Sequence, residues 1–295
     1  MSQELNVDYG KKIAEFEAAM KKFKIKRIIY KRVFLGKGLE FDGYRLFNPD
    51  DDAGLIDWKA SLRSNQKLVR QYIEERDLKI VFLVDVSDNM VFGSQEKLKC
   101  EYAAEICTAL SHLIITSGDK VGGFLFNEKI AKRTGISGGL EQFQLFSYIL
   151  KDSKNYGGRI NFREVLDYIN KILDDSISAV IIVSDFLKLK EDMLDKLKTF
   201  GNRFETFCVM IKDPLDRTLP DLNKRIVIED PETEKQVQID PQLLKKRYEK
   251  FALERENMIK DMFKKSNIDF VEISTDKNFI FPLVSFLKQR VRRKE

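Results

Sequence analysis

Cysteine and histidine are scarce in this sequence of 295 residues. The three cysteines, Cys100, Cys107 and Cys208, form no C-x-x-C pair, which argues against a zinc site and against a disulfide framework. We expect them to be small buried hydrophobic residues in a reducing compartment. The one histidine, His112, lies inside an apolar helical stretch. The sequence therefore gives little support to a Ser-His-Asp triad or to a histidine-bound metal.

Long apolar runs and nucleotide-binding signatures are also missing. No stretch approaches the roughly 18 apolar residues of a membrane-spanning helix, and the N-terminus lacks the apolar core of a signal peptide. We therefore expect a soluble, cytoplasmic protein. Neither G-x-x-x-x-G-K-[ST] nor a G-x-G-x-x-G after a strand is present. The charge balance, 52 − 47 = +5, is mild and spread along the chain, so no nucleic-acid partner is expected.

From residue 78 onward, apolar runs alternate with amphipathic segments. The apolar runs predict strands at 79–85, 120–127, 179–185, 205–211 and 269–274. The amphipathic periodicity predicts helices at 95–116, 139–152, 162–174, 189–200, 241–266 and 278–292. Strands that are apolar on both faces and alternate with helices indicate a doubly wound α/β fold, with a mostly parallel sheet flanked by helices.

The first part of the chain has a different character. A helix is predicted at 11–25, followed by a segment rich in turns, aromatic residues and charge, in which "LVRQYIEE" favours a short strand. Later, two alternating runs around "DPETE" predict a β-hairpin, placed as an insertion at about 213–240. We therefore expect an N-terminal region over 1–76 and an α/β domain over 77–295.

Oxygen-bearing side chains follow two of the predicted strands. Asp85 ends one strand, Ser87 and Asn89 follow it at alternate positions, and Asp185 ends another. In an open parallel sheet, ligands bind beyond the carboxyl ends of the strands, so these four residues form a candidate site. Hard oxygen ligands suit Mg²⁺ or Mn²⁺. Capping of the next helix is the alternative that the residues leave open.

The same residues carry a resemblance to a known domain. "DVSDNM", the helix after it and the later "VIIVSDF" resemble a von Willebrand factor A domain, whose metal-ion-dependent adhesion site reads D-x-S-x-S with a distant Thr and a distant Asp. Asp85, Ser87 and Asp185 match that pattern, whereas Asn89 replaces the second Ser. Arg159 or Ile160 stands where the Thr is expected. The resemblance implies a site for Mg²⁺ or Mn²⁺ in which a carboxylate from a partner completes the coordination of the ion.

A second resemblance covers roughly residues 30 to 293. The stretch "GKGLEFDGYRLFNPDDDAGLIDWKASLR" is similar to the signature of domain-of-unknown-function family 58. The resemblance implies an adaptor for a MoxR-type AAA+ ATPase in the chaperone-like maturation of other proteins. Within the signature, Asp57, Trp58 and Arg63 fall in one compact segment. We expect Asp57 to pair with Arg63 over a packed Trp58, either as a structural clamp or as a surface that a partner binds.

These observations favour a non-catalytic protein-interaction module. One alternative is a Mg²⁺-dependent phosphoester hydrolase that uses Asp85 and Asp185. The other is a structural domain whose metal site has decayed, in which case the changes Asn89→Ser and Ile160→Thr should raise metal affinity.

Overall fold

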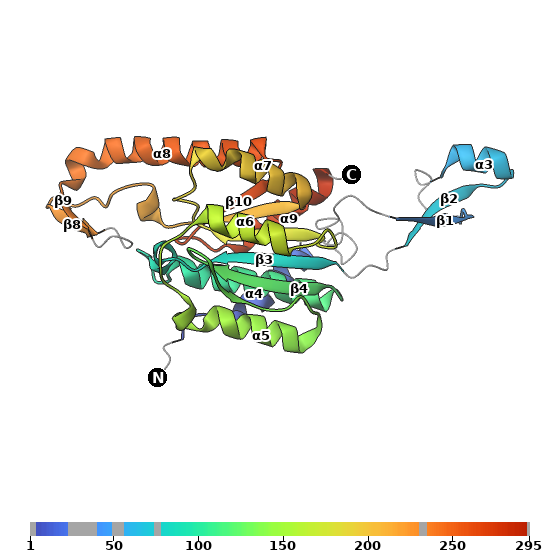
Figure 1. The fold of residues 1–295 in the computed structure, drawn as a ribbon, viewed down its shortest axis with the longest axis horizontal. Coiled ribbons are helices and arrows are strands. Elements are labelled where there is room, and N and C mark those ends of the chain that lie inside the picture. Colours follow the sequence, from blue (N-terminus) through green and yellow to red (C-terminus); the bar gives the residue numbers. More distant parts are fainter. Residues whose placement is uncertain (1–3, 23–39, 49–55, 74–77, 230–234, 294–295) are drawn as a thin grey trace.

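A six-stranded sheet with helices on both faces forms the main body of the molecule (Figure 1). The computed structural model describes residues 4–22, 40–48, 56–73, 78–229 and 235–293. The strand order is β10-β7-β6-β3-β4-β5, and every neighbouring pair is parallel except β4 and β5. The strands are β3 (Lys79–Asp85), β4 (Lys120–Phe126), β5 (Ile130–Arg133), β6 (Ala179–Ser184), β7 (Thr206–Lys212) and β10 (Asp269–Ser274).

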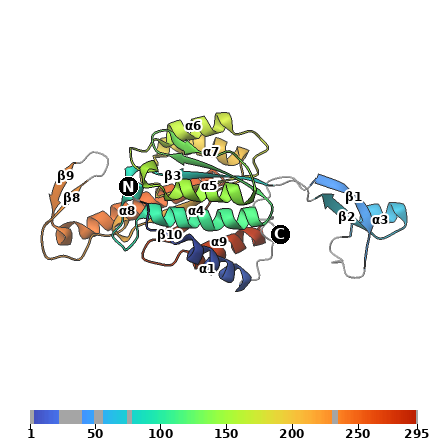
Figure 2. The same ribbon diagram turned by 90° about the horizontal axis from the view of Figure 1, so that it is seen from below.

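The helices form one layer on each face of the sheet (Figures 1 and 2). One layer holds α1 (Tyr9–Lys22), α4 (Lys99–Thr116), α5 (Gly139–Lys151) and α9 (Ile280–Arg293). The other holds α6 (Phe162–Ile172), α7 (Leu194–Arg203) and α8 (Pro241–Lys265). Short 3-10 turns connect several elements: η2 (Asp88–Val91), η3 (Ser153–Asn155), η4 (Glu191–Met193) and η5 (Pro214–Asp216).

The central strand β3 shows why the apolar runs are unbroken. Ile80 and Phe82 point into the core beneath α4, whereas Val81 and Leu83 point into the core beneath α6 and α7. All four side chains are buried, because successive residues of a strand face opposite sides and both sides are covered. The predicted α/β class with a mostly parallel sheet is confirmed.

Three differences from the predicted elements have local causes. The strand β5 was not predicted, because it is a four-residue antiparallel edge strand with exposed, charged side chains. The helix predicted from residue 95 begins at Lys99, since the backbone N–H of Ser94 is held by Asp213 in a loop. The helix predicted over 189–200 begins as the 3-10 turn η4 and continues as α7 to Arg203.

The N-terminal part of the chain divides between two places. The helix α1 packs against α4 and α9, with Phe16 and Met20 in the same core. The strands β1 (Glu40–Leu46) and β2 (Leu68–Ile73) pair antiparallel, and together with α3 (Trp58–Ser64) they form a small unit beyond the amino ends of the sheet strands (Figures 1 and 2). The strand predicted in "LVRQYIEE" is therefore confirmed as β2. The predicted division at residue 76 would separate α1 from the helices on which it packs.

The hairpin predicted around "DPETE" is also confirmed. Its strands are β8 (Ile226–Glu229) and β9 (Gln236–Ile239), which pair antiparallel. In Figure 1 the hairpin lies with the start of α8 at the end of the molecule to which β3 points. Two parts of the family signature, residues 36–39 and 49–55, lie outside the described residues.

Candidate functional site

The candidate site lies where the connections of the sheet change direction. The chain leaves β3 for β4 on one side, and later builds β6, β7 and β10 on the other side of β3. The switch point therefore falls between β3 and β6, which is where ligands bind in open α/β sheets. Asp85 is the last residue of β3, and Asp185 directly follows β6. The prediction that both carboxylates reach one edge of the sheet agrees with this arrangement.

Asp85 is completely buried and held by two donors. The Ser184 hydroxyl donates to its Oδ2 atom over 2.5 Å, and the Ser87 backbone N–H donates to its Oδ1 atom over 2.9 Å. Burial, and after it the negative charge of Asp185, raise the pKa of Asp85 to about 7. Asp85 is thus a buried carboxyl group that favours its neutral form.

Ser87 and Asn89 lie in the turn after β3 and are both buried. The Ser87 hydroxyl faces Asp85 closely enough to favour the charged carboxylate, yet it makes no hydrogen bond of its own. A buried hydroxyl without a hydrogen-bond partner, at a position where the sequence predicts a metal ligand, is consistent with that prediction. Asp85, Ser87 and Asn89 are therefore brought into one turn, as the alternate spacing predicts.

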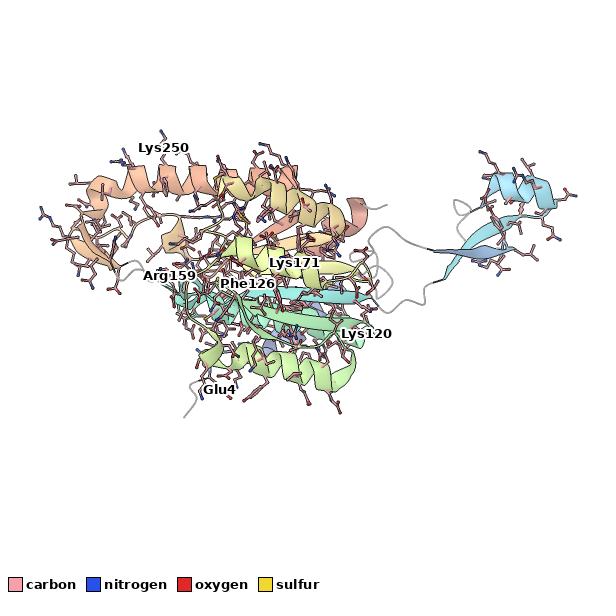
Figure 3. The ribbon with its side chains drawn as sticks, in the orientation of Figure 1. Glu4, Lys120, Phe126, Arg159, Lys171 and Lys250 are labelled. Carbon is pink, nitrogen blue, oxygen red and sulfur yellow. The ribbon has the colours of Figure 1, made fainter. Side chains whose placement is uncertain are left out.

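The loop expected to supply a threonine is held against this turn by its glycines. Asp88 donates from its backbone N–H to the Gly158 carbonyl and accepts the Gly158 N–H on Oδ1, both over 2.9 Å. Gly157 and Gly158 have φ values of +125° and +85°, a region that favours glycine. The side chain of Ile160 packs against the core that contains Phe162, and Arg159 is exposed (Figure 3). Neither is placed as a ligand.

A buried lysine, which the sequence reasoning missed, joins the site. The Nζ atom of Lys99 lies 2.7 Å from Oδ2 of Asp185 and 3.3 Å from Oδ2 of Asp216, and the Lys99 side chain is 1% exposed. Burial alone would lower the pKa of Lys99, but the carboxylates of Asp185 and Asp216 outweigh it and raise that pKa. The sequence held one weak signal: a lysine lies in the first part of the helix that follows the Asp-Ser-Asn turn, where a cation opposes the helix dipole.

A second buried carboxylate, Asp213, ties three loops together. It accepts hydrogen bonds from the Ser94 N–H and hydroxyl over 2.7 and 2.6 Å, and from the Thr275 hydroxyl over 3.1 Å. Its own N–H donates to Asp216 over 2.8 Å, which fixes the partner of Lys99. These bonds lower the pKa of Asp213 despite its burial. Burial of Asp216, in contrast, raises the pKa of Asp216 even though Lys99 opposes that change.

As the side chains lie, this set does not fit a divalent cation. The Lys99 ammonium is bonded to Oδ2 of Asp185, and the Leu187 N–H donates to Oδ1 over 2.9 Å. A second cation beside the ammonium would have to overcome like-charge repulsion in a buried place. Within the described ranges, no group of three or more His, Cys, Asp or Glu side chains is arranged to hold a metal. The arrangement is a buried charge cluster in which an ammonium occupies the carboxylate oxygens.

The second predicted site has a different geometry from the one expected. Asp57 caps the start of α3, accepting the N–H groups of Lys59 and Ala60 over 3.1 Å, and Trp58 is 61% exposed. Among the ion pairs between described residues, none joins Asp57 to Arg63. The expected pair is therefore wrong: Arg63 lies in the last turn of α3, about 9 Å along the helix from its cap. The expected packing over Trp58 is also wrong.

Comparison with known families and proteins gives the following matches. Residues 43–258 match the model of DUF58, described as a protein of unknown function. Uncharacterized proteins of Mycobacterium bovis and Mycobacterium tuberculosis are 25% identical over 263 residues, which cover 87% of this chain and 81% of theirs. These relatives carry no stated activity.

Solved structures share the fold at low sequence identity. An aerotolerance-related membrane protein from Bacteroides fragilis has a TM-score of 0.50 at 11% identity, over 73% of this chain and 99% of that one. BatB from Bacteroides thetaiotaomicron has a TM-score of 0.49 at 12% identity over the same shares. The first is a membrane protein by name, which contradicts the predicted cytoplasmic location. That prediction came from the lack of a spanning segment, and indeed no described helix has the length and apolar character to cross a bilayer.

Proposed function

Because the chain belongs to the DUF58 family, proteins of unknown function, we propose that it is a non-catalytic protein-interaction module. Its sheet resembles that of a von Willebrand factor A domain, and the carboxyl edge of the sheet binds a protein partner. The partner is a MoxR-type AAA+ ATPase, for which this chain acts as an adaptor in the maturation of other proteins. The partner class comes from the family resemblance of the sequence, and the position of the surface comes from the geometry below.

One observation carries the proposal: the exposed ring of Phe92 lies over the buried charge cluster, and its neighbour Val91 is exposed as well. Val91 is 44% exposed and Phe92 is 37% exposed, and both directly follow the Asp-Ser-Asn turn. The Phe92 ring lies 5.6 Å from Nζ of Lys99, so its inner side contacts the buried ammonium. Apolar residues beside polar neighbours at a strand-end edge form the centre of many protein interfaces.

The rim of this surface is polar and charged. Ser94, Gln95 and Glu96 are exposed next to Phe92 along the chain, and the exposed Arg159 lies across the edge on the glycine loop (Figure 3). A polar rim around an apolar centre fits a partner that binds and leaves again. It gives less support to a permanent subunit contact, which is usually more apolar.

The small N-terminal unit offers a second contact for the same partner. Trp58 and Leu62 on α3 are 61% and 83% exposed. Because Trp is enriched among interface anchors and is exposed here, we assign α3, with Asp57, Trp58 and Arg63, to partner binding as well. The two surfaces lie at opposite ends of the molecule (Figure 1), so each can be tested without the other.

The test is a direct binding measurement between the purified chain and a MoxR-type ATPase from the same organism, with nucleotide present. We expect Phe92→Ala and Val91→Ser to weaken binding by about tenfold or more, as loss of an interface anchor does. Leu140→Ser is the matched control, because Leu140 is exposed on α5 near the amino ends of the strands. No complex, or equal binding by Phe92→Ala, would refute the strand-end assignment. Loss only in Trp58→Ala would place the interface on α3.

Mg²⁺-dependent phosphoester hydrolysis is the second candidate. The observation in its favour is the raised pKa of Asp85, since a carboxyl whose pKa lies near neutral pH can serve as a general acid or base. Complete burial of Asp85 and the ammonium on Asp185 weigh against it. A generic phosphatase substrate with Mg²⁺ tests the idea. Turnover that Asp85→Asn abolishes would support a hydrolase, and the same turnover in both proteins would point to a contaminant.

A further inference from the structure

The cation of the strand-end site is already part of the chain. Lys99 is the first residue of α4, where the helix dipole disfavours a positive charge, and its side chain is 1% exposed. Lys99 is therefore unfavourable for two separate reasons. Burial of an ammonium costs free energy, and so does a positive charge at a helix N-terminus. Such a residue persists when surrounding charges compensate for it.

The compensating charges come from two different parts of the fold. Asp185 follows β6 and accepts the ammonium over 2.7 Å, and Asp216 in η5 accepts it over 3.3 Å. The Lys99 ammonium thus neutralises the carboxylates that a divalent ion at this edge would have to use.

The hydrogen bonds around the carboxylates lead to the same conclusion. The two oxygens of Asp185 are bonded to Lys99 and to the Leu187 N–H, and the two oxygens of Asp85 to Ser184 and to the Ser87 N–H. The Ser87 hydroxyl alone is left without a partner. A functional metal site would engage this hydroxyl, whereas an ammonium bonded on the Asp185 side leaves it unused.

We propose that Lys99 is the resident cation of the strand-end site and that the ammonium excludes Mg²⁺ and Mn²⁺ from it. The native chain then presents its edge to partners without a metal. Removing the positive charge of Lys99 exposes Asp185 and Asp216 and converts the same residues into a divalent-cation site. This inference concerns the chain alone, so it stands or falls independently of the partner proposed above.

The experiment is titration calorimetry of MnCl₂ and MgCl₂ into native protein, Lys99→Gln and the control Lys188→Gln. Lys188 is exposed three residues after Asp185, so its variant loses the same charge at the same edge of the sheet but keeps the Lys99 ammonium on Asp185 and Asp216. We expect no saturable binding by native protein or Lys188→Gln. We expect Lys99→Gln to bind Mn²⁺ at least about tenfold more tightly than either, because a repelling buried charge is gone. Adding Asp185→Asn to Lys99→Gln should abolish that gain.

Two results would overturn the proposal. One is Mn²⁺ binding by the native chain that disappears in Asp85→Ala, since the metal would then coexist with the ammonium. The other is a folded Lys99→Gln variant that binds no metal. If Lys99→Gln unfolds, its recovery is followed by circular dichroism: the proposal requires that Mn²⁺ restores the fold of Lys99→Gln but has no effect on the double variant with Asp185→Asn. Failure of Mn²⁺ to restore it counts against the proposal.

Discussion

The Ser184 hydroxyl donates a 2.5 Å hydrogen bond to Oδ2 of Asp85, and so joins the ends of β6 and β3 beyond their backbone ladder. The same hydroxyl accepts the Phe186 N–H over 3.0 Å. Asp85 is therefore held in a buried position where both its burial and the charge of Asp185 favour protonation. The stability of the fold should therefore depend on pH in part through Asp85.

The first prediction concerns Asp85→Asn. The pKa of Asp85 rises from 3.8 to about 7 on folding, so the folded state binds the proton more tightly. The contribution of Asp85 to stability is then complete below pH 4 and is lost as the pH rises to 7. The difference between the two pKa values limits the contribution of Asp85 to the free energy of unfolding to about 4 kcal/mol.

Urea unfolding of both proteins between pH 4 and pH 8 measures this dependence. We expect the unfolding free energy of the native chain to fall relative to that of Asp85→Asn as the pH rises. Parallel curves for the two proteins would show that Asp85 is charged in the fold throughout.

The second prediction concerns the free energy of unfolding of Lys99→Met. Loss of the ammonium leaves Asp185 and Asp216 buried without their cation, and breaking a buried pair from one side costs about 3–5 kcal/mol. Adding Asp185→Asn should recover part of that loss, which a double-mutant cycle in urea would quantify. Lys188→Met should change stability by less than about 0.5 kcal/mol, as an exposed substitution does. A mild effect of Lys99→Met would mean that the ammonium contributes little to the fold.

The third prediction separates the resident lysine from a decayed metal site. If the site had lost metal binding only because Asn89 and Ile160 replace metal ligands, Asn89→Ser with Ile160→Thr would raise the affinity for Mn²⁺. We expect no gain while Lys99 is present, because the ammonium remains and Ile160 packs toward the core of Phe162. Ile160→Thr should instead cost about 1 kcal/mol of stability. Titration calorimetry of Mn²⁺ into the double variant distinguishes the two accounts. Clear Mn²⁺ binding by the double variant would favour the decayed metal site.

The fourth prediction concerns the loops tied by Asp213. Asp213→Ala removes the acceptor of three hydrogen bonds from Ser94 and Thr275 and leaves the buried Thr275 hydroxyl without that acceptor. We expect a loss of about 2–4 kcal/mol, with Thr275→Ala costing about 1 kcal/mol. Chemical denaturation provides both values. Equal losses in the two variants would mean that Thr275 accounts for the whole effect.

The fifth prediction concerns the cap of α3. Asp57→Ala removes the acceptor for the N–H groups of Lys59 and Ala60, which typically costs about 1 kcal/mol, whereas Asp57→Asn should be nearly neutral. Hydrogen exchange of the α3 amides reports the change locally. Arg63→Ala serves as the control and should leave exchange unchanged. If Arg63→Ala accelerated exchange as much as Asp57→Ala, the predicted ion pair would regain support.

The sequence by itself determined the architecture. In β3 every residue from Ile80 to Val84 is apolar, and such a run is stable only where helices cover both faces of the strand. The alternation of runs with amphipathic segments then predicted the order of strands and helices. The same reasoning placed Asp85 and Asp185 at one edge, because parallel strands end on the same side. Short elements such as β5 escaped it, since four residues carry too little periodicity.

Only the tertiary structure decided which charges meet at that edge. Lys99 and Asp216 are 117 residues apart, and no local pattern relates them. Their contact depends on the strand order β7-β6-β3 in the sheet. This order brings the loop after β7 close to the start of α4. A motif specifies the residues of one turn, whereas the charge of a buried site is the sum over every element that packs around it. In this protein the turn from Asp85 to Asn89 predicts a metal ion, whereas the packed structure places the Lys99 ammonium against Asp185.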